Sequence, residues 1–282
     1  MIARMATYEA LAPLGRLESL SDILAAGADA VYAGLYGFSS RPSDADLSLE
    51  QLESARELTA KRGVKLYVAV NSFIGHTQMD ALLRQLEIVE QLGADAVILG
   101  DWGVLQAARS ALKTTRLHAS TLLGVYNSET VSILKGLGVD RIVLSTALYI
   151  EEIHSLLRQT PDIEYEIIAS GGICRNDNRQ CELPHDGKSL DYKVACRRTY
   201  FLQGDGPRRP AKSIAQPQLQ LERILGAYMA MGIQSYKIEG RTLPRQTICE
   251  RVRRLRKAID SFMEDSSHFS GYNPYFCQAS RR

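Results

Sequence analysis

A short unit that recurs along the chain constrains its fold most strongly. It consists of a glycine, two or three linking residues and an apolar run, as in AGADAVYAGL, RGVKLYVAV, LGADAVILG, LGVDRIVLS and MGIQSYKIEG. A glycine just after a helix permits the left-handed conformation that ends the helix. A short apolar run is typical of a parallel strand that is buried on both faces. The unit therefore predicts helices that are each followed by a buried parallel strand.

Strand candidates of this kind alternate with segments that have the periodicity of amphipathic helices. They span residues 8–12, 29–35, 65–71, 95–101, 116–121, 141–146, 165–170 and 235–240. Eight β/α units in a chain of 282 residues predict a TIM (β/α)8 barrel. A doubly wound open sheet is the alternative, but no glycine-rich dinucleotide turn follows the first strand candidate. We assign residues 1–265 to the barrel domain and 266–282 to a C-terminal tail.

The bulk properties favour a cytoplasmic protein. No apolar run approaches the roughly 20 residues that span a bilayer, and the N-terminus lacks the pattern of a signal peptide. The formal net charge is only +2, which argues against a membrane or a nucleic acid as partner. In a reducing compartment, clustered cysteines bind metals or react more often than they form disulfides.

The connection between the seventh and eighth strand candidates is much longer than the others. Its first part, which we place at residues 171–213, holds Cys174, Cys181 and Cys196. The carboxyl end of a barrel strand lies on the active-site face, so this loop is predicted to lie there. Spacing alone leaves three interpretations: scattered thiols, a structural zinc site that includes His185, or an iron–sulfur cluster. A cluster requires a fourth ligand, either Cys249 or Cys277.

Polar side chains fall near the ends of several strand candidates. They are Glu9, Tyr32, Asn71, Asp101, His118, Ser120, Ser145 and Ser170. Because catalytic groups of a TIM barrel gather at the carboxyl ends of the strands, we predict that these residues lie there. We assign the first six to substrate binding.

The segment KIEGR in the last strand candidate carries three alternating charges, Lys237, Glu239 and Arg241. Alternation along a strand places side chains on one face. Either the three residues hold an anionic substrate, with Arg241 as the bidentate partner of a carboxylate, or Lys237 and Glu239 neutralise one another.

The motifs EALAPLGRLESL, VAVNSF, HASTLLGVYNSE, GGIC-x6-C and YKIEGRTLP form a set within residues 8–262. This set resembles the peptidase U32 family of collagenase-like proteins. The resemblance implies an oxygen-independent hydroxylase of ubiquinone precursors, tRNA or rRNA, with a TIM barrel and prephenate as the oxygen donor. It also implies a [4Fe-4S] cluster on four cysteines, with Cys174, Cys181 and Cys196 as ligands and Cys249 as a provisional fourth.

The chain departs from the family pattern at four positions. Leu122 and Gly124 stand where the family has Gln and Asn, Thr146 stands in place of Arg, and Ser170 stands in place of His. These changes remove polar groups from the pocket, which argues against prephenate as the oxygen donor.

We therefore predict an iron–sulfur hydroxylase that modifies an aromatic or cofactor-type small molecule, with Lys237, Glu239 and Arg241 as catalytic residues. The alternatives are a non-catalytic or paired subunit that forms a heterodimer with a related barrel, an RNA-modifying hydroxylase, and a protease.

Overall fold

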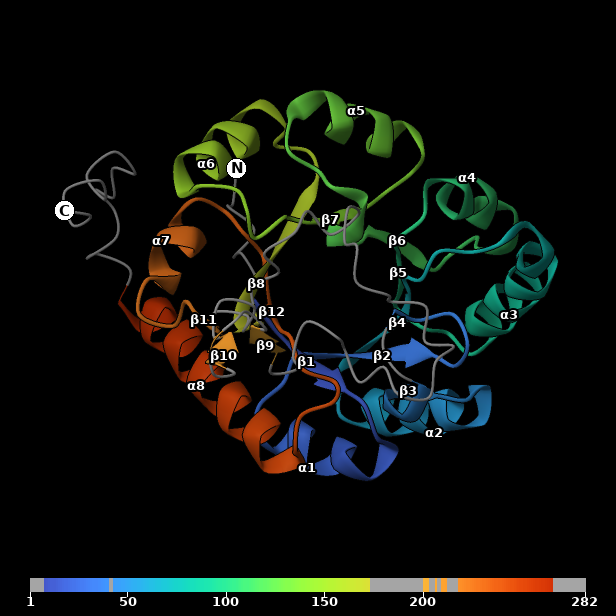
Figure 1. The fold of residues 1–282 in the computed structure, drawn as a ribbon, viewed down its shortest axis with the longest axis horizontal. Coiled ribbons are helices and arrows are strands. Elements are labelled where there is room, and N and C mark those ends of the chain that lie inside the picture. The colour runs from blue at the N-terminus through green and yellow to red at the C-terminus, as the bar shows by residue number, and fades with distance from the viewer. Residues whose placement is uncertain are drawn as a thin grey trace.

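In the computed structural model, parallel strands close into a barrel at the centre of the molecule (Figure 1). The structure describes residues 8–40, 43–172, 200–202, 206, 209–211 and 218–265. The order around the barrel is β1-β12-β8-β7-β6-β5-β4-β2, and β2 pairs with β1 to close it. The barrel strands are β1 (Glu9–Leu14), β2 (Ala30–Leu35), β4 (Lys65–Val70), β5 (Ala96–Leu99), β6 (Arg116–Ala119), β7 (Arg141–Val143), β8 (Glu164–Gly172) and β12 (Ser235–Ile238). The predicted TIM barrel is confirmed.

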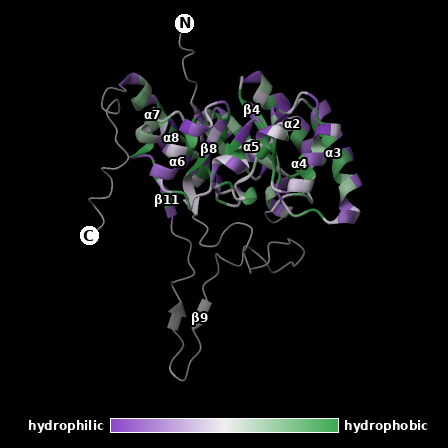
Figure 2. Ribbon diagram, turned by 90° about the horizontal axis from the view of Figure 1, so that it is seen from above, coloured by the Kyte–Doolittle hydropathy of each residue, from purple (hydrophilic) through white to green (hydrophobic). Residues whose placement is uncertain are grey.

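Helices surround the barrel (Figure 1). They are α1 (Leu20–Ala25), α2 (Leu49–Lys61), α3 (Met79–Gln91), α4 (Trp102–Ala111), α5 (Ser128–Gly136), α6 (Ile150–Gln159), α7 (Leu225–Ala230) and α8 (Arg245–Glu264). Helices such as α2 and α3 carry both hydrophilic and hydrophobic residues, as expected of an amphipathic outer layer (Figure 2). Glycines that follow five of these helices have positive φ, as the repeated unit predicts: Gly27, Gly63, Gly93, Gly138 and Gly232.

Local sequence explains where several helices begin. Ser48 and Gln51 form a reciprocal capping box at the start of α2. The Asp101 carboxylate accepts hydrogen bonds from two backbone amides of α4, and the Asn127 side chain accepts one from α5. These side chains satisfy amide groups that have no partner within the helix.

Four short strands lie outside the barrel wall. β3 (Asp46–Leu47) runs parallel to β2, and β11 (Gln218–Gln220) runs antiparallel to β8. β9 (Tyr200–Leu202) and β10 (Arg209–Ala211) pair with each other. The sequence predicted none of the four, because strands of two or three residues have too little periodicity to detect.

The long connection begins where β8 ends, at Gly172. Most of the predicted cysteine loop and the tail at 266–282 lie outside the described residues, so the domain assignment stays a prediction. Within the described ranges, no helix is long and apolar enough to cross a membrane.

The core has two parts. The larger part packs the helices against the outside of the strands and includes Val252, Leu255 and Ile259 of α8. The smaller part lies in the barrel lumen and draws only on strand residues: Leu11, Ala30, Tyr32, Tyr67, Ala69, Ala96 and Ile98. Three of these seven are alanines, so the apolar side chains leave much of the lumen to other residues.

Candidate active site

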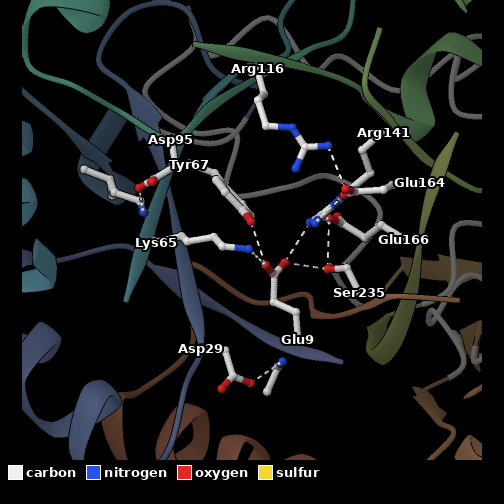
Figure 3. Close-up of polar contacts among 12 residues, drawn as sticks. Glu9, Asp29, Lys65, Tyr67, Asp95, Arg116, Arg141, Glu164, Glu166 and Ser235 are labelled. Atoms are coloured by element: carbon white, nitrogen blue, oxygen red, sulfur yellow. Dashed lines mark hydrogen bonds and ion pairs between the residues drawn. The ribbon is translucent and has the colours of Figure 1, made fainter. Parts of the chain in front are cut away.

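A cluster of charged side chains fills the amino-terminal part of the lumen (Figure 3). At its centre is Arg141, the first residue of β7, whose side chain is only 3 % exposed. Its Nη1 donates to Glu9 Oε1 at 2.7 Å and to Glu166 Oε2 at 3.4 Å, and its Nη2 donates to Glu164 Oε2 at 2.9 Å. One guanidinium thus joins carboxylates from β1 and β8. We call these four residues the Arg141 cluster.

Further polar groups donate hydrogen bonds to the Glu9 carboxylate. Tyr67 donates to Glu9 Oε2 at 2.6 Å, Lys65 donates to the same oxygen at 3.2 Å, and Ser235 donates to Oε1 at 2.8 Å. Burial raises the pKa of Glu9, but the charge of Arg141 and the hydrogen bonds from Arg141 and Tyr67 outweigh burial and hold the pKa at about 2. Glu9 is therefore ionised and fully satisfied by hydrogen bonds.

This shift makes stability depend on pH. Since the pKa of Glu9 falls from an ordinary 4.5 to about 2 on folding, its stabilisation is fully present above pH 4.5 and is lost as the pH falls through 2. The loss amounts to about 3 kcal/mol. Urea unfolding between pH 6 and pH 2 is expected to show a larger fall in the free energy of unfolding for the wild type than for the Glu9→Gln variant, in which Glu90 and Glu164 still titrate. Equal slopes for both proteins would contradict this assignment.

A second group of charges lies farther along the same strands. Lys237 Nζ donates to Glu166 Oε1 at 3.0 Å and lies 4.3 Å from the centroid of the Tyr32 ring. The guanidinium carbon of Arg241 lies 5.9 Å from the same centroid. The structure therefore brings together three residues that the sequence predicted for the site, Tyr32, Lys237 and Arg241. Both cations gain from the negative face of the ring.

Arg241 is positioned by two neighbours. Its Nη1 donates to Asp46 Oδ1 at 2.8 Å, and its Nη2 donates to Ser39 Oγ at 2.6 Å. Gly34 lies so close to both side chains that a Cβ atom at this position would overlap Arg241 and Asp46. Burial raises the pKa of Asp46 to about 6, although Arg241 and Ser39 lower it. Arg241 therefore keeps an ionised partner only above about pH 6.

Each of the three charges of KIEGR has a partner outside this segment. Lys237 pairs with Glu166, whereas the Glu239 carboxylate accepts a hydrogen bond from the backbone amide of Gly172 at 3.0 Å. The register with β8 shifts between Lys237 and Ile238, which interrupts the simple alternation that the sequence predicted. Glu239 thus fixes the point at which the chain leaves β8.

The other predicted site residues have separate roles. Asp101 caps α4, Ser120 caps the short helix Thr121–Leu123, and Asn71 accepts a hydrogen bond from the amide of Ser40. The placement predicted for Glu9 is wrong, because it is the first residue of β1 and so lies at the amino end of the barrel.

His118 of β6 is fully buried against Tyr67, with ring centroids 4.8 Å apart. Within the described part of the chain, neither ring nitrogen has a hydrogen-bond partner. Burial and the nearby charge of Arg141 lower the pKa of His118 well below 6.5, so the imidazole is neutral. A neutral imidazole offers one donor and one acceptor.

A cavity of about 570 Å³ lies beside Arg241 at the carboxyl ends of β1 and β12. Arg16, Arg241 and Arg245 line it together with Glu18 and Asp44. Arg16 is exposed, so a charged group that enters the cavity from solvent can reach it.

Of the five cysteines, only Cys249 falls in the described ranges. It is buried in the apolar layer between α8 and the barrel, and burial raises its pKa. Cys174, Cys181, Cys196 and Cys277 lie outside the described residues, so the ligand set stays a prediction. Among the residues that the structure describes, no group of three or more His, Cys, Asp and Glu side chains is arranged to hold a metal ion.

Sequence reasoning missed Arg141 and Glu166. Each is a charge inside an otherwise apolar strand candidate, RIVLST and YEIIAS. A charge at a lumen-facing position of a buried strand requires a partner, and that signal was available from the sequence.

Comparisons with known proteins agree with the fold and identify the family. The tRNA hydroxylation protein P1 of Bacillus subtilis (strain 168) is 29 % identical over 275 residues, which are 93 % of this chain and 65 % of that protein. The 23S rRNA 5-hydroxycytidine C2501 synthase of Escherichia coli (strain K12) is 28 % identical over 265 residues, 91 % of this chain and 40 % of that one. This chain thus spans less than two thirds of the length of either relative.

A solved structure of the U32 peptidase Mk0906 superposes with a TM-score of 0.58 at 13 % identity, covering 86 % of this chain and 97 % of that chain. At this identity it supports the fold alone.

The relatives overturn two predictions. Their names state RNA hydroxylation, which contradicts a small-molecule substrate and contradicts the argument against a nucleic acid partner. Net charge averages over the whole surface, so a value near zero does not exclude a nucleic acid partner. Residues 15–280 match Peptidase family U32, and the chain belongs to this family.

Proposed function

We propose that this protein is an RNA-modifying hydroxylase whose target base enters the mouth of the barrel. The observation that carries the proposal is the similarity, over more than nine tenths of the chain, to proteins named for tRNA and rRNA hydroxylation. The polar lumen supports it, because Lys237, Tyr32 and Arg241 gather in one place.

Chemistry on a base requires that the base leave its stack. Enzymes that modify bases act on unpaired nucleotides or extrude the target into a pocket. In a TIM barrel the loops at the carboxyl ends of the strands form the active site, and a target base can bind there. RNA loops provide unpaired bases that can enter it.

Lys237 and His118 are suited to hold the base. The Lys237 ammonium contacts both Glu166 and the Tyr32 ring, so its position is fixed before substrate arrives. His118, neutral and without a partner among the described residues, can donate one hydrogen bond and accept another. A base edge presents donors and acceptors of this kind, whereas a charged imidazole could only donate.

Arg241 and the adjoining cavity are suited to hold phosphate. Arginine binds phosphate oxygens through two parallel hydrogen bonds, and Arg16 and Arg245 line the same cavity. We therefore propose that phosphate is bound beside the lumen and not within it.

The point at which the cysteine loop begins supports the [4Fe-4S] cluster that the family resemblance implies. The chain leaves β8 at Gly172, two residues before Cys174, at the mouth of the barrel and beside Glu239. We propose that Cys174, Cys181 and Cys196 bind a [4Fe-4S] cluster, with Cys249 or Cys277 as the fourth ligand. Thiolates are the ligands that such clusters require, and a bound cluster supplies electron transfer. Prephenate as oxygen donor and a related barrel as partner subunit stay predictions.

The proposal is tested by the nucleosides of tRNA and rRNA from strains with and without the gene. A hydroxylated nucleoside is expected to disappear from the strain that lacks the gene, as seen by mass spectrometry of digested RNA. Identical nucleoside profiles in the two strains would overturn the proposal.

A further inference from the structure

Among the residues that the structure describes, exposed aromatic side chains are confined to one face. In the described ranges the exposed aromatic residues are Tyr36 (59 %), Phe73 (60 %), Tyr126 (38 %) and Tyr149 (64 %). The exposed large aliphatic residues lie elsewhere, on the outer helices or at the start of one: Leu58, Ile88, Ile133, Ile224 and Met263. The two kinds of exposed apolar residue are therefore separated on the surface.

All four aromatic residues follow the carboxyl end of a barrel strand. Tyr36 comes directly after β2, Phe73 follows β4, Tyr126 lies between β6 and α5, and Tyr149 lies between β7 and α6. Because the carboxyl ends of parallel barrel strands meet at one face, these residues surround the mouth of the lumen. We call them the aromatic arc.

The arc is continuous around the barrel. The strands β2, β4, β5, β6 and β7 are consecutive neighbours in the wall (Figure 1). β5 adds Trp102, a half-buried residue at the start of α4. On the other side of the wall, β12 is followed by Glu239 and Arg241, and β1 is followed by Arg16. The mouth thus has an aromatic side and a charged side.

We propose that the aromatic arc stacks unpaired bases on either side of the target nucleotide, while Arg16 and Arg245 hold the adjoining phosphates. This inference rests on the proposed RNA substrate. Stacking on aromatic rings is how proteins bind single-stranded RNA without reading each base, since every base has a π-face. Arginines opposite the rings match the negative charge of the backbone.

One contact restrains a ring of the arc. Ser145 donates a hydrogen bond to the Tyr126 hydroxyl at 3.3 Å, which joins the loop after β6 to the loop after β7. A ring held in place loses less conformational freedom when a base stacks on it.

A protein partner is the competing occupant of this face. The cores of protein interfaces combine aromatic residues with Met and other apolar side chains. Here the exposed aliphatic residues lie away from the mouth, and arginines line the cavity beside it. This separation favours RNA.

The test uses the full chain and a fluorescein-labelled single-stranded RNA of mixed sequence, alone or annealed to its complement. Fluorescence anisotropy is expected to show that the wild type prefers the single strand. The double variant Phe73→Ala/Tyr149→Ala is expected to bind the single strand about tenfold more weakly or worse. Tyr149→Phe, which keeps the ring, and Ile133→Ala, an exposed position on α5, should bind within about twofold of the wild type.

Two results of the binding assay would overturn the inference. One is a double variant that binds the single strand as tightly as the wild type, and the other is a wild type with no preference for the single strand. A double variant that no longer co-purifies with a protein bound by the wild type, but binds RNA with unchanged affinity, would show that the arc binds a protein partner and not RNA. RNA hydroxylation in cells is a separate readout that distinguishes the two proposals. If hydroxylation depends on the gene but the double variant restores it fully, the aromatic arc does not bind RNA, whereas the proposed hydroxylase function stands.

Discussion

Replacing Arg141 with methionine is expected to lower the free energy of unfolding by about 3–5 kcal/mol. The substitution removes the cation that joins Glu9, Glu164 and Glu166, and it leaves the carboxylates of Glu9 and Glu166 buried with too little positive charge nearby. Methionine fills much of the same volume, so the loss reports charge and hydrogen bonding more than packing. Urea unfolding followed by circular dichroism measures it.

Arg116 provides the matched control. It also pairs with Glu164, at 2.8 Å, but its side chain is 36 % exposed. Arg116→Met is expected to cost no more than about 1 kcal/mol, because solvent screens an exposed pair. The double variant Arg141→Met/Glu9→Gln should recover part of the loss, since it neutralises one of the stranded carboxylates. Similar losses for Arg141→Met and Arg116→Met would show that the Arg141 cluster is not the electrostatic centre of the barrel.

Alanine at Cys174, Cys181 or Cys196 is expected to abolish iron binding and, with it, RNA hydroxylation. Cluster assembly requires about four thiolates, so the loss of one strongly weakens the site. Anaerobic reconstitution followed by iron analysis and visible absorption spectra measures the effect. The wild type should hold about four irons per chain.

Cys249 and Cys277 give the comparison within the same chain. If Cys277 is the fourth ligand, Cys249→Ala keeps its iron and loses only some stability, since Cys249 packs in the apolar layer under α8. If Cys249 is the fourth ligand, Cys277→Ala keeps its iron and Cys249→Ala loses it. Cys174→Ala and Cys181→Ala proteins that hold as much iron as the wild type would contradict the proposed cluster.

The barrel could be predicted because its signals are local. A glycine such as Gly93 ends a helix, an apolar run such as AVIL forms a strand, and both signals lie within ten residues. Eight repetitions leave few architectures that bury every strand.

The candidate site could be predicted only in part, because its contacts depend on register between distant strands. Arg141 meets Glu9 across 132 positions of sequence, and Lys237 meets Glu166 across 71. The alternation in KIEGR suggested that its charges act together, but the pairing with β8 gives each a different partner. The exposed aromatic residues share no motif and come together only when the barrel closes.

The central claim is that this barrel hydroxylates RNA within its lumen, and complementation of a deletion strain tests it most directly. Mass spectrometry of digested tRNA and rRNA should show a hydroxylated nucleoside that disappears with the gene and returns with the wild-type chain. It should not return with Lys237→Met, in which Glu166 keeps its contacts with Arg141 and Ser235. Nucleoside profiles that do not change on deletion, or full restoration by Lys237→Met at equal protein level, would contradict the claim.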